Sequence, residues 1–194
     1  SVNQDRCARG LIRCTFKNAL CGTGAPCVYG EVDVEAALAV SSDAFFYKLG
    51  EDLLVQNEGE PIFQEEVEAF GFGADTGIEL PFEYDGTVPD QELKRLYAER
   101  GVISEDEGRG FYVGDSIQMS IGQGLLSATP LQLNQGYSVL ANGGLVIQPT
   151  LISTVFEPGT PDGRPGYANI YGGTVHQSSQ APAIQRNLDI DDEL

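Results

Sequence analysis

The chain has 194 residues, of which 41% are hydrophobic and 21% are charged. It is long enough for one domain with a hydrophobic core, and this composition excludes a disordered chain. Asp and Glu outnumber Lys and Arg by 29 to 11, so the formal net charge is −18, which excludes nucleic acid and anionic lipid as partners because both bind through Lys and Arg. No run reaches the roughly 20 apolar residues of a membrane span, and residues 1–5 lack the basic and apolar regions of a signal peptide. Any membrane anchor is therefore expected outside this chain.

Residues 1–30 are predicted to form a loop region rich in cysteine. All four cysteines of the chain lie there: Cys7, Cys14, Cys21 and Cys27. No C-x-x-C pair is present, which argues against a zinc site. Four cysteines allow three pairings, and the sequence does not choose among them. The flexible Gly-Thr-Gly-Ala-Pro between the last two would let them meet. We favour disulfides in an oxidising compartment, the alternative being four free thiols in a cytosolic protein.

Two helices are expected next. Asp33 can cap a helix that continues to Val40. The string Ser41-Ser42-Asp43 then precedes the aromatic segment AFFYKLG. By itself, this string is typical of a helix N-cap.

The middle of the chain predicts two short helices and a glycine-rich loop. Residues 62–70 place apolar side chains at i, i+4 and i+7, and Gly71 follows as a C-cap. The run FGADTGIELP comes next. Residues 91–100 suit a surface helix, and the mixed charges of 87–113 are interpreted as a solvated face.

The segment from Gly114 to Gly144 contains the most informative pattern. Ile121-Gly122-Gln123-Gly124 predicts a tight turn. Thr129-Pro130 predicts a helix start, and an apolar stripe follows at i, i+4 and i+7, formed by Leu133, Tyr137 and Leu140. Asn142-Gly143-Gly144 would end that helix.

The end of the chain gives weaker signals. Residues 145–156 are predicted to be extended, with Pro149 arguing against a central strand position. Residues 158–194 are interpreted as loop and weakly ordered tail. His176, the only histidine, has no evident partners nearby and is expected at the surface.

These motifs together resemble the transpeptidase domain of the penicillin-binding proteins. The letters IGQG, TPLQ and ANGG occur here in the order and spacing of that family, and FGFG followed by TGI, LP, E and G supports the match. The resemblance covers about residues 16–156. It implies an α+β fold of the penicillin-binding-protein/β-lactamase type, mostly the helical subdomain with an incomplete antiparallel sheet. We expect 31–156 to be the transpeptidase-domain core portion and 157–194 to be loop and acidic tail.

The resemblance also implies site residues. Ser41-Ser42-Asp43 is similar to the family's second motif, Ser-x-Asn, in which the serine relays protons and the asparagine orients the substrate backbone. An aspartate at 43 keeps the acceptor oxygen and loses the NH₂ donor. The expected catalytic residues are Ser41 and Asp43, and the expected substrate-binding residues are Ser42, Gly122, Gln123 and Gly124. No metal or cofactor is expected.

Two other motifs of the family are missing from this chain. The only lysines are Lys17, Lys48 and Lys94, which follow Cys14, Phe45 and Gln91 by three residues. No Ser-x-x-Lys nucleophile motif and no Lys-Thr-Gly strand is therefore present. We infer an internal portion of a longer transpeptidase domain that is inactive alone, with the acylated serine elsewhere in the polypeptide.

The implied parent activity is D,D-transpeptidation of peptidoglycan. The implied partners are peptidoglycan stem peptides, β-lactams and the remaining segments of the same domain, which would cover apolar helix faces left open here. The implied location is the extracytoplasmic cell envelope. We expect Ser41 and the turn around Gln123 to form two walls of one cleft.

Two alternatives are left open. One is a non-catalytic module of the same fold that acts in cell-wall assembly. The other is a cysteine enzyme in which Cys14 and Lys17 replace the usual Ser-x-x-Lys pair.

Overall fold

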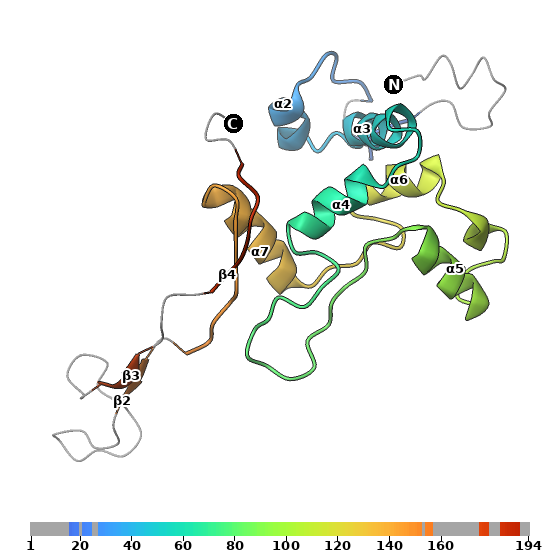
Figure 1. The fold of residues 1–194 in the computed structure, drawn as a ribbon. Coiled ribbons are helices and arrows are strands. Elements are labelled where there is room, and N and C mark those ends of the chain that lie inside the picture. The colour runs from blue at the N-terminus through green and yellow to red at the C-terminus, as the bar shows by residue number, and fades with distance from the viewer. Residues whose placement is uncertain are drawn as a thin grey trace. The chain divides into compact units, whose positions relative to one another are not determined.

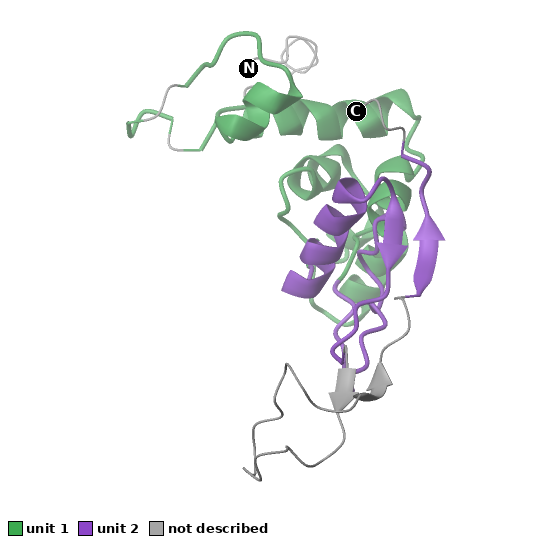
Figure 2. Ribbon diagram, turned by 90° about the vertical axis from the view of Figure 1, so that its left-hand side faces the viewer, with its two compact units in different colours: residues 1–68, 87–127 green, residues 69–86, 128–194 purple. Residues whose placement is uncertain are grey.

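The structure is a computed structural model that describes residues 16–19, 21–24, 27–152, 154–156, 175–178 and 183–190. Its contacts divide the chain into two compact units, which are shown in different colours in Figure 2. The first unit comprises Ser1–Glu68 and Thr87–Ser127, and the second comprises Ala69–Gly86 and Ala128–Leu194. Our division into regions 1–30, 31–156 and 157–194 stays a prediction.

The first unit is helical (Figure 1). The helices among its described residues are α2 (Val34–Ala39), α3 (Asp43–Gln56), α4 (Ile62–Ala69), α5 (Gln91–Glu99), the 3₁₀ turn η1 (Glu107–Arg109) and α6 (Val113–Met119). The predicted cap of α2 is confirmed, because the Asp33 carboxylate accepts a 2.8 Å hydrogen bond from the Ala36 amide. The predicted helices at 62–70 and 91–100 are confirmed within one residue at their ends.

Helix α6 was not predicted from the sequence. It packs on α3, and it buries Ser116, Ile117 and Met119. Its start is fixed by Asp115, whose carboxylate accepts a 2.7 Å bond from the amide of Tyr112.

The interpretation of 87–113 as a solvated charged face is wrong for one residue. Lys94 is only 2% exposed. Its ammonium lies 2.5 Å from the Asp115 carboxylate and 4.8 Å from the centroid of the Tyr112 ring. Both acceptors stand on or beside α6, so this ion pair between a buried lysine and a half-buried aspartate ties α5 to α6. The other charged pair of α5, Arg95–Glu99, is exposed as expected.

In the part of the second unit that the structure describes, α7 (Pro130–Ala141) is accompanied by four short strands in two antiparallel pairs. Strands β1 (Leu145–Ile147) and β4 (Ile184–Asn187) pair with Val146 opposite Arg186, and β2 (Thr154–Phe156) and β3 (Val175–Ser178) pair with Val155 opposite Gln177. The predicted extended conformation is thus confirmed at 145–147 and 154–156. The interpretation of 158–194 as loop and tail is wrong for β3 and β4, which needed distant partners to form. His176 lies in β3, and its side chain lies outside the described residues.

Helix α7 begins as predicted. Thr129 is its N-cap and Pro130 its first residue, and Thr129 and Gln132 form a reciprocal capping box with bonds of 2.9 and 3.1 Å. The apolar stripe is exposed, with Leu133 at 51%, Tyr137 at 67% and Leu140 at 57%. The opposite face is the buried one and carries Gln132, Gln135, Gly136 and Val139.

Glutamine side chains hold the loop of residues 71–86 in the second unit. The Gln132 carboxamide donates to the carbonyls of Ala74 (2.8 Å) and Asp85 (2.6 Å). Gln148 and Gln185 donate in the same way to the carbonyls of Gly77 and Thr76. The glutamine of the TPLQ letters therefore caps its own helix and fixes a loop that lies far away in the sequence.

Candidate functional site

Ser41 sits in a backbone conformation that usually belongs to glycine. Its φ is 52°, its side chain is exposed, and it directly follows α2. The Ser41 amide bonds the carbonyl of Leu38 at 3.1 Å, and the Ser42 amide bonds that of Ala37 at 2.8 Å. This is the pair of bonds of a Schellman motif, in which the left-handed position is normally glycine. A serine there costs roughly 1 kcal/mol relative to glycine, so the helix end explains the conformation but not the choice of serine.

The start of α3 is held by a residue from the N-terminal loop. Ser42 occupies the N-cap position, but its side chain makes no cap bond. Instead, the Asn18 carboxamide oxygen accepts from the Ala44 amide at 3.0 Å and from the Ser42 hydroxyl at 3.2 Å. In return, the Asp43 carboxylate accepts from the Ala19 amide at 2.6 Å. Ser42 and Asn18 are buried, at 4% and 6% exposure.

Sequence reasoning missed the role of Asn18. The residue lies 26 positions before the amide that it caps. Helix-capping rules search only the few residues next to a helix, so no local signal could have found it.

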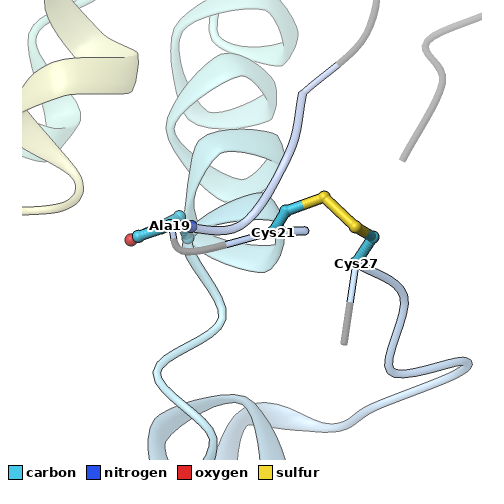
Figure 3. The surroundings of a disulfide bond; sticks show 4 residues. Ala19, Cys21 and Cys27 are labelled. Atoms are coloured by element: carbon cyan, nitrogen blue, oxygen red, sulfur yellow. A yellow bond between two sulfur atoms is a disulfide. The ribbon is translucent and has the colours of Figure 1, made fainter. Parts of the chain in front are cut away.

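A disulfide joins Cys21 and Cys27 with a Cα–Cα separation of 4.6 Å (Figure 3). The Cys21 amide bonds the Asn18 carbonyl at 3.3 Å, so the closed loop is attached to the segment that caps α3. Among the residues that the structure describes, this is the pairing present, and it is one of the possibilities that the sequence left open. Cys7 and Cys14 lie outside the described residues, so the alternative in which Cys14 and Lys17 form the nucleophile pair stays a prediction.

The predicted turn after α6 is present. Gly122 and Gly124 have φ of 72° and 77°, and Gln123 between them is exposed. The Gln123 amide bonds the Gln118 carbonyl at 2.9 Å, which ties the turn back onto α6. A Cβ at residue 124 would lie 2.9 Å from Oε1 of Gln118, so both the conformation and the space favour glycine there.

The structure brings the two candidate segments onto a pair of packed helices in the first unit. Ser120, directly before the turn, donates from its hydroxyl to the carbonyl of Phe46 at 2.8 Å. Phe46 lies in the first turn of α3, three residues after Asp43. That Ser41 and Gln123 form two walls of one cleft stays a prediction.

Ser42, the buried residue of the Ser41–Asp43 motif, borders a cavity of about 450 Å³ in the first unit. Phe16, Val28, Tyr29 and Phe45 give it a mostly apolar lining, to which Ser42 also contributes. The side chains of Ser41 and Ser42 therefore have different surroundings, solvent for one and the protein interior for the other.

The pKa of Tyr47 reflects its position near the start of α3. Its pKa is raised above the ordinary value, first because burial disfavours the phenolate and second because the Asp43 carboxylate repels it. Asp43 and Tyr47 are four residues apart in α3 and therefore lie on the same side of the helix. Among the residues that the structure describes, no cluster of three or more His, Cys, Asp or Glu side chains could hold a metal ion.

A family model described as the penicillin binding protein transpeptidase domain matches residues 21–193. The chain belongs to this family. Peptidoglycan D,D-transpeptidase MrdA of Salmonella typhimurium is 32% identical over 168 residues, which cover 82% of this chain and 25% of that protein. This transpeptidase-domain chain therefore spans about a quarter of the length of the curated relatives it matches.

Solved structures support the same fold. The crystal structure of Pseudomonas aeruginosa PBP2 in complex with WCK 5153 matches with a TM-score of 0.53 and 28% identity, over 81% of this chain and 30% of that one. Penicillin-binding protein 2B of Streptococcus pneumoniae matches with a TM-score of 0.56 and 20% identity, over 83% of this chain and 23% of that one. The family and the α+β fold that the sequence predicted are confirmed. Within the described ranges, no helix has the length and apolar character needed to cross a membrane.

Proposed function

We propose that this chain is a portion of a peptidoglycan D,D-transpeptidase whose nucleophilic serine lies elsewhere in the polypeptide. The observation that carries the proposal is the conformation of Ser41. An exposed serine stands at a left-handed position where glycine is favoured, in the second motif of a transpeptidase family. Backbone strain of this kind collects at functional sites, where the side chain is needed in spite of its cost.

The proposed reaction is acyl transfer through a serine ester. The nucleophilic hydroxyl attacks the carbonyl of the penultimate D-Ala, its proton passes to the leaving amine, and D-Ala departs. An amine of a second stem peptide then attacks the ester and regenerates the serine hydroxyl. We assign Ser41 to proton relay between the nucleophile and the leaving amine, since its hydroxyl can both donate and accept.

The remaining site residues have supporting roles in this proposal. Asp43 orients the substrate backbone and the nucleophile's lysine as an acceptor. Gly122, Gln123 and Gly124 present main-chain groups and one carboxamide to the substrate. Ser42 belongs to the proposed substrate-binding set, and since its hydroxyl is buried against Asn18, we propose that it acts by holding the Ser41–Asp43 segment in place.

The uncovered face of α7 supports the proposed partner segments. Leu133, Tyr137 and Leu140 are more than half exposed on a helix whose other face is packed. Burial of such side chains is worth about 1.5–3 kcal/mol each, so further parts of the transpeptidase domain are proposed to cover them. The disulfide fits the proposed extracytoplasmic location, where such bonds persist.

Labelling with a fluorescent penicillin tests the proposed function. The full-length protein is incubated with the reagent, and the modified residue is mapped by mass spectrometry. We expect one labelled serine outside this chain and release of D-Ala from a stem pentapeptide. An intact, folded full-length protein that takes up no label would instead support the non-catalytic module.

Hydrogen exchange tests the proposed covering of α7. Amides of α7 are compared in the isolated chain and in the full-length protein. The stripe residues should be protected at least tenfold more strongly in the full-length protein, whereas the amides of the buried Ser116–Met119 segment should change less. Equal protection of α7 in both would contradict the proposal.

A further inference from the structure

Ser116 on α6 and Ser120 at its C-cap bind two main-chain carbonyls on α3. Ser116 donates from Oγ to the carbonyl of Gly50 at 2.7 Å, and Ser120 donates to that of Phe46 at 2.8 Å. Both the donors and the acceptors are four residues apart, so each set lies on one helix face. The order is reversed, and the helices therefore run in opposite directions along this contact.

The contact is too close for a side chain at residue 50. A Cβ built on Gly50 would lie 2.7 Å from the Ser116 carbonyl oxygen and 2.9 Å from Cβ of Ser120. The absence of a Cβ thus allows the backbones to approach within reach of two serine hydroxyls. Ser116 is 1% exposed, so the Ser116–Gly50 end of this contact is shielded from water.

The two hydroxyl hydrogen bonds fix the register of α6 along α3, because hydrogen bonds are directional. Close backbone contact at Gly50 alone would not fix this register. Both accepting carbonyls belong to α3, where helix bonds already use one of their lone pairs. Ser120 has a local alternative, because the carbonyl of Ile117 is also 2.8 Å from its Oγ. One hydroxyl donates one proton at a time, so the Ser120 bond to Phe46 competes with a bond to Ile117 in the preceding turn.

The candidate site segments lie at the same end of this helix pair. Phe46 follows Asp43 by three residues, and Ser120 directly precedes the turn of 121–124. A shift of one helix along the other would therefore change the distance between the motif serine and the turn.

We propose that Ser116 and Ser120 are positioning residues for acylation. They fix the register of α3 on α6, and through it the placement of Ser41 relative to Gln123. The inference rests on the proposed transpeptidase function. Misplacement of about 1 Å in an active site can cost about 10²-fold in rate, so loss of the Ser120 bond is expected to slow acylation by about tenfold.

The test is made on the full-length protein with Ser120→Ala, Ser120→Thr and a matched control, Ser138→Ala. Ser138 is an exposed serine on α7 that bonds only the carbonyl of Asn134 in its own helix. The binding constant and the first-order acylation constant for a chromogenic β-lactam are measured separately by stopped flow. The fraction of active molecules is counted by penicillin titration.

We expect Ser120→Ala to lower the acylation constant about tenfold with an unchanged binding constant. Ser120→Thr, which keeps the hydroxyl, should stay within about twofold of wild type, and so should Ser138→Ala. Wild-type acylation by every active molecule of Ser120→Ala would overturn the inference, even if fewer molecules are folded. If wild type is not acylated at all, the proposed function fails, and this result is distinct from the first.

Discussion

The two units of the chain hold their loops by different means. In the first unit, helices contact each other directly through the Ser116 and Ser120 hydroxyls and through the buried Lys94–Asp115 pair. In the second unit, glutamine carboxamides reach from α7 and from the strands to carbonyls of the 71–86 loop. The first arrangement fixes helix register, and the second fixes a glycine-rich loop that has no ladder of its own.

The two units differ in how fully their own residues pack and bond their side chains. In the first unit, side chains of the same unit hold both candidate site segments. Asn18 and Asp43 make hydrogen bonds at the start of α3, and Ser120 makes one directly before the turn of 121–124. The second unit packs one face of α7 with polar side chains and leaves the apolar face uncovered. We therefore expect changes in the first unit to act on the site and changes in the second to act on assembly with the rest of the domain.

The largest loss of stability is expected from Asp115→Asn in the first unit. The change removes the charge that compensates an ammonium with 2% exposure. Breaking a buried pair from one side costs about 3 kcal/mol. Urea unfolding of the full-length protein measures it, and Glu99→Gln serves as the control, because the exposed Arg95–Glu99 pair on the same helix is worth at most about 0.5 kcal/mol. Equal effects of the two variants would show that the Lys94 pair is not buried.

In the second unit, Gln132→Ala is expected to cost about 2 kcal/mol. The variant loses one half of the capping box and leaves the carbonyls of Ala74 and Asp85 without their donor. Asn134→Ala, an exposed position on the same helix, should cost nothing and is expected to gain up to about 0.7 kcal/mol, because Ala is the better helix former. The same denaturation series compares them. A small effect of Gln132→Ala would mean that the loop of 71–86 is held by the other contacts alone.

The smallest expected effect is a shift in the pKa of Tyr47 in the first unit. Replacing Asp43 by Asn should lower the pKa of Tyr47 towards its ordinary value without reaching it, because burial is the larger cause of the rise. A raised phenol pKa favours the neutral form in the folded state, so this contribution to stability is present below about pH 10 and is lost as the pH rises through the folded value. Ultraviolet titration of Asp43→Asn, with a Tyr47→Phe subtraction, measures the shift. An unchanged pKa of Tyr47 in Asp43→Asn would show that the Asp43 charge does not act on Tyr47.

Local chemistry made much of the fold predictable. Asp33, Thr129-Pro130 and the glycines at 122 and 124 act within a few residues of their own positions, and the structure confirms each. Helix α6 escaped prediction because it is seven residues long, contains Gly114 and has no ordinary capping residue at Tyr112.

The other missed features depend on distant partners. Burial of Lys94 requires Asp115 on another helix, the cap of α3 comes from Asn18, and β4 forms only against β1. Charge patterns and periodicity report on a residue's neighbours in sequence, and these contacts span 21 or more positions. The candidate site was named from motif letters, and the strain at Ser41 became visible only in the backbone.

Ser41→Gly in the full-length protein tests the central claim most directly. Glycine suits the left-handed position, so unfolding should become harder by about 0.5–1 kcal/mol, while loss of the relay hydroxyl should slow acylation by a fluorescent penicillin by about 10²-fold. A variant that is more stable and slower in acylation is the result that we predict. A variant acylated at the wild-type rate would contradict the assignment of Ser41 to the transpeptidase site.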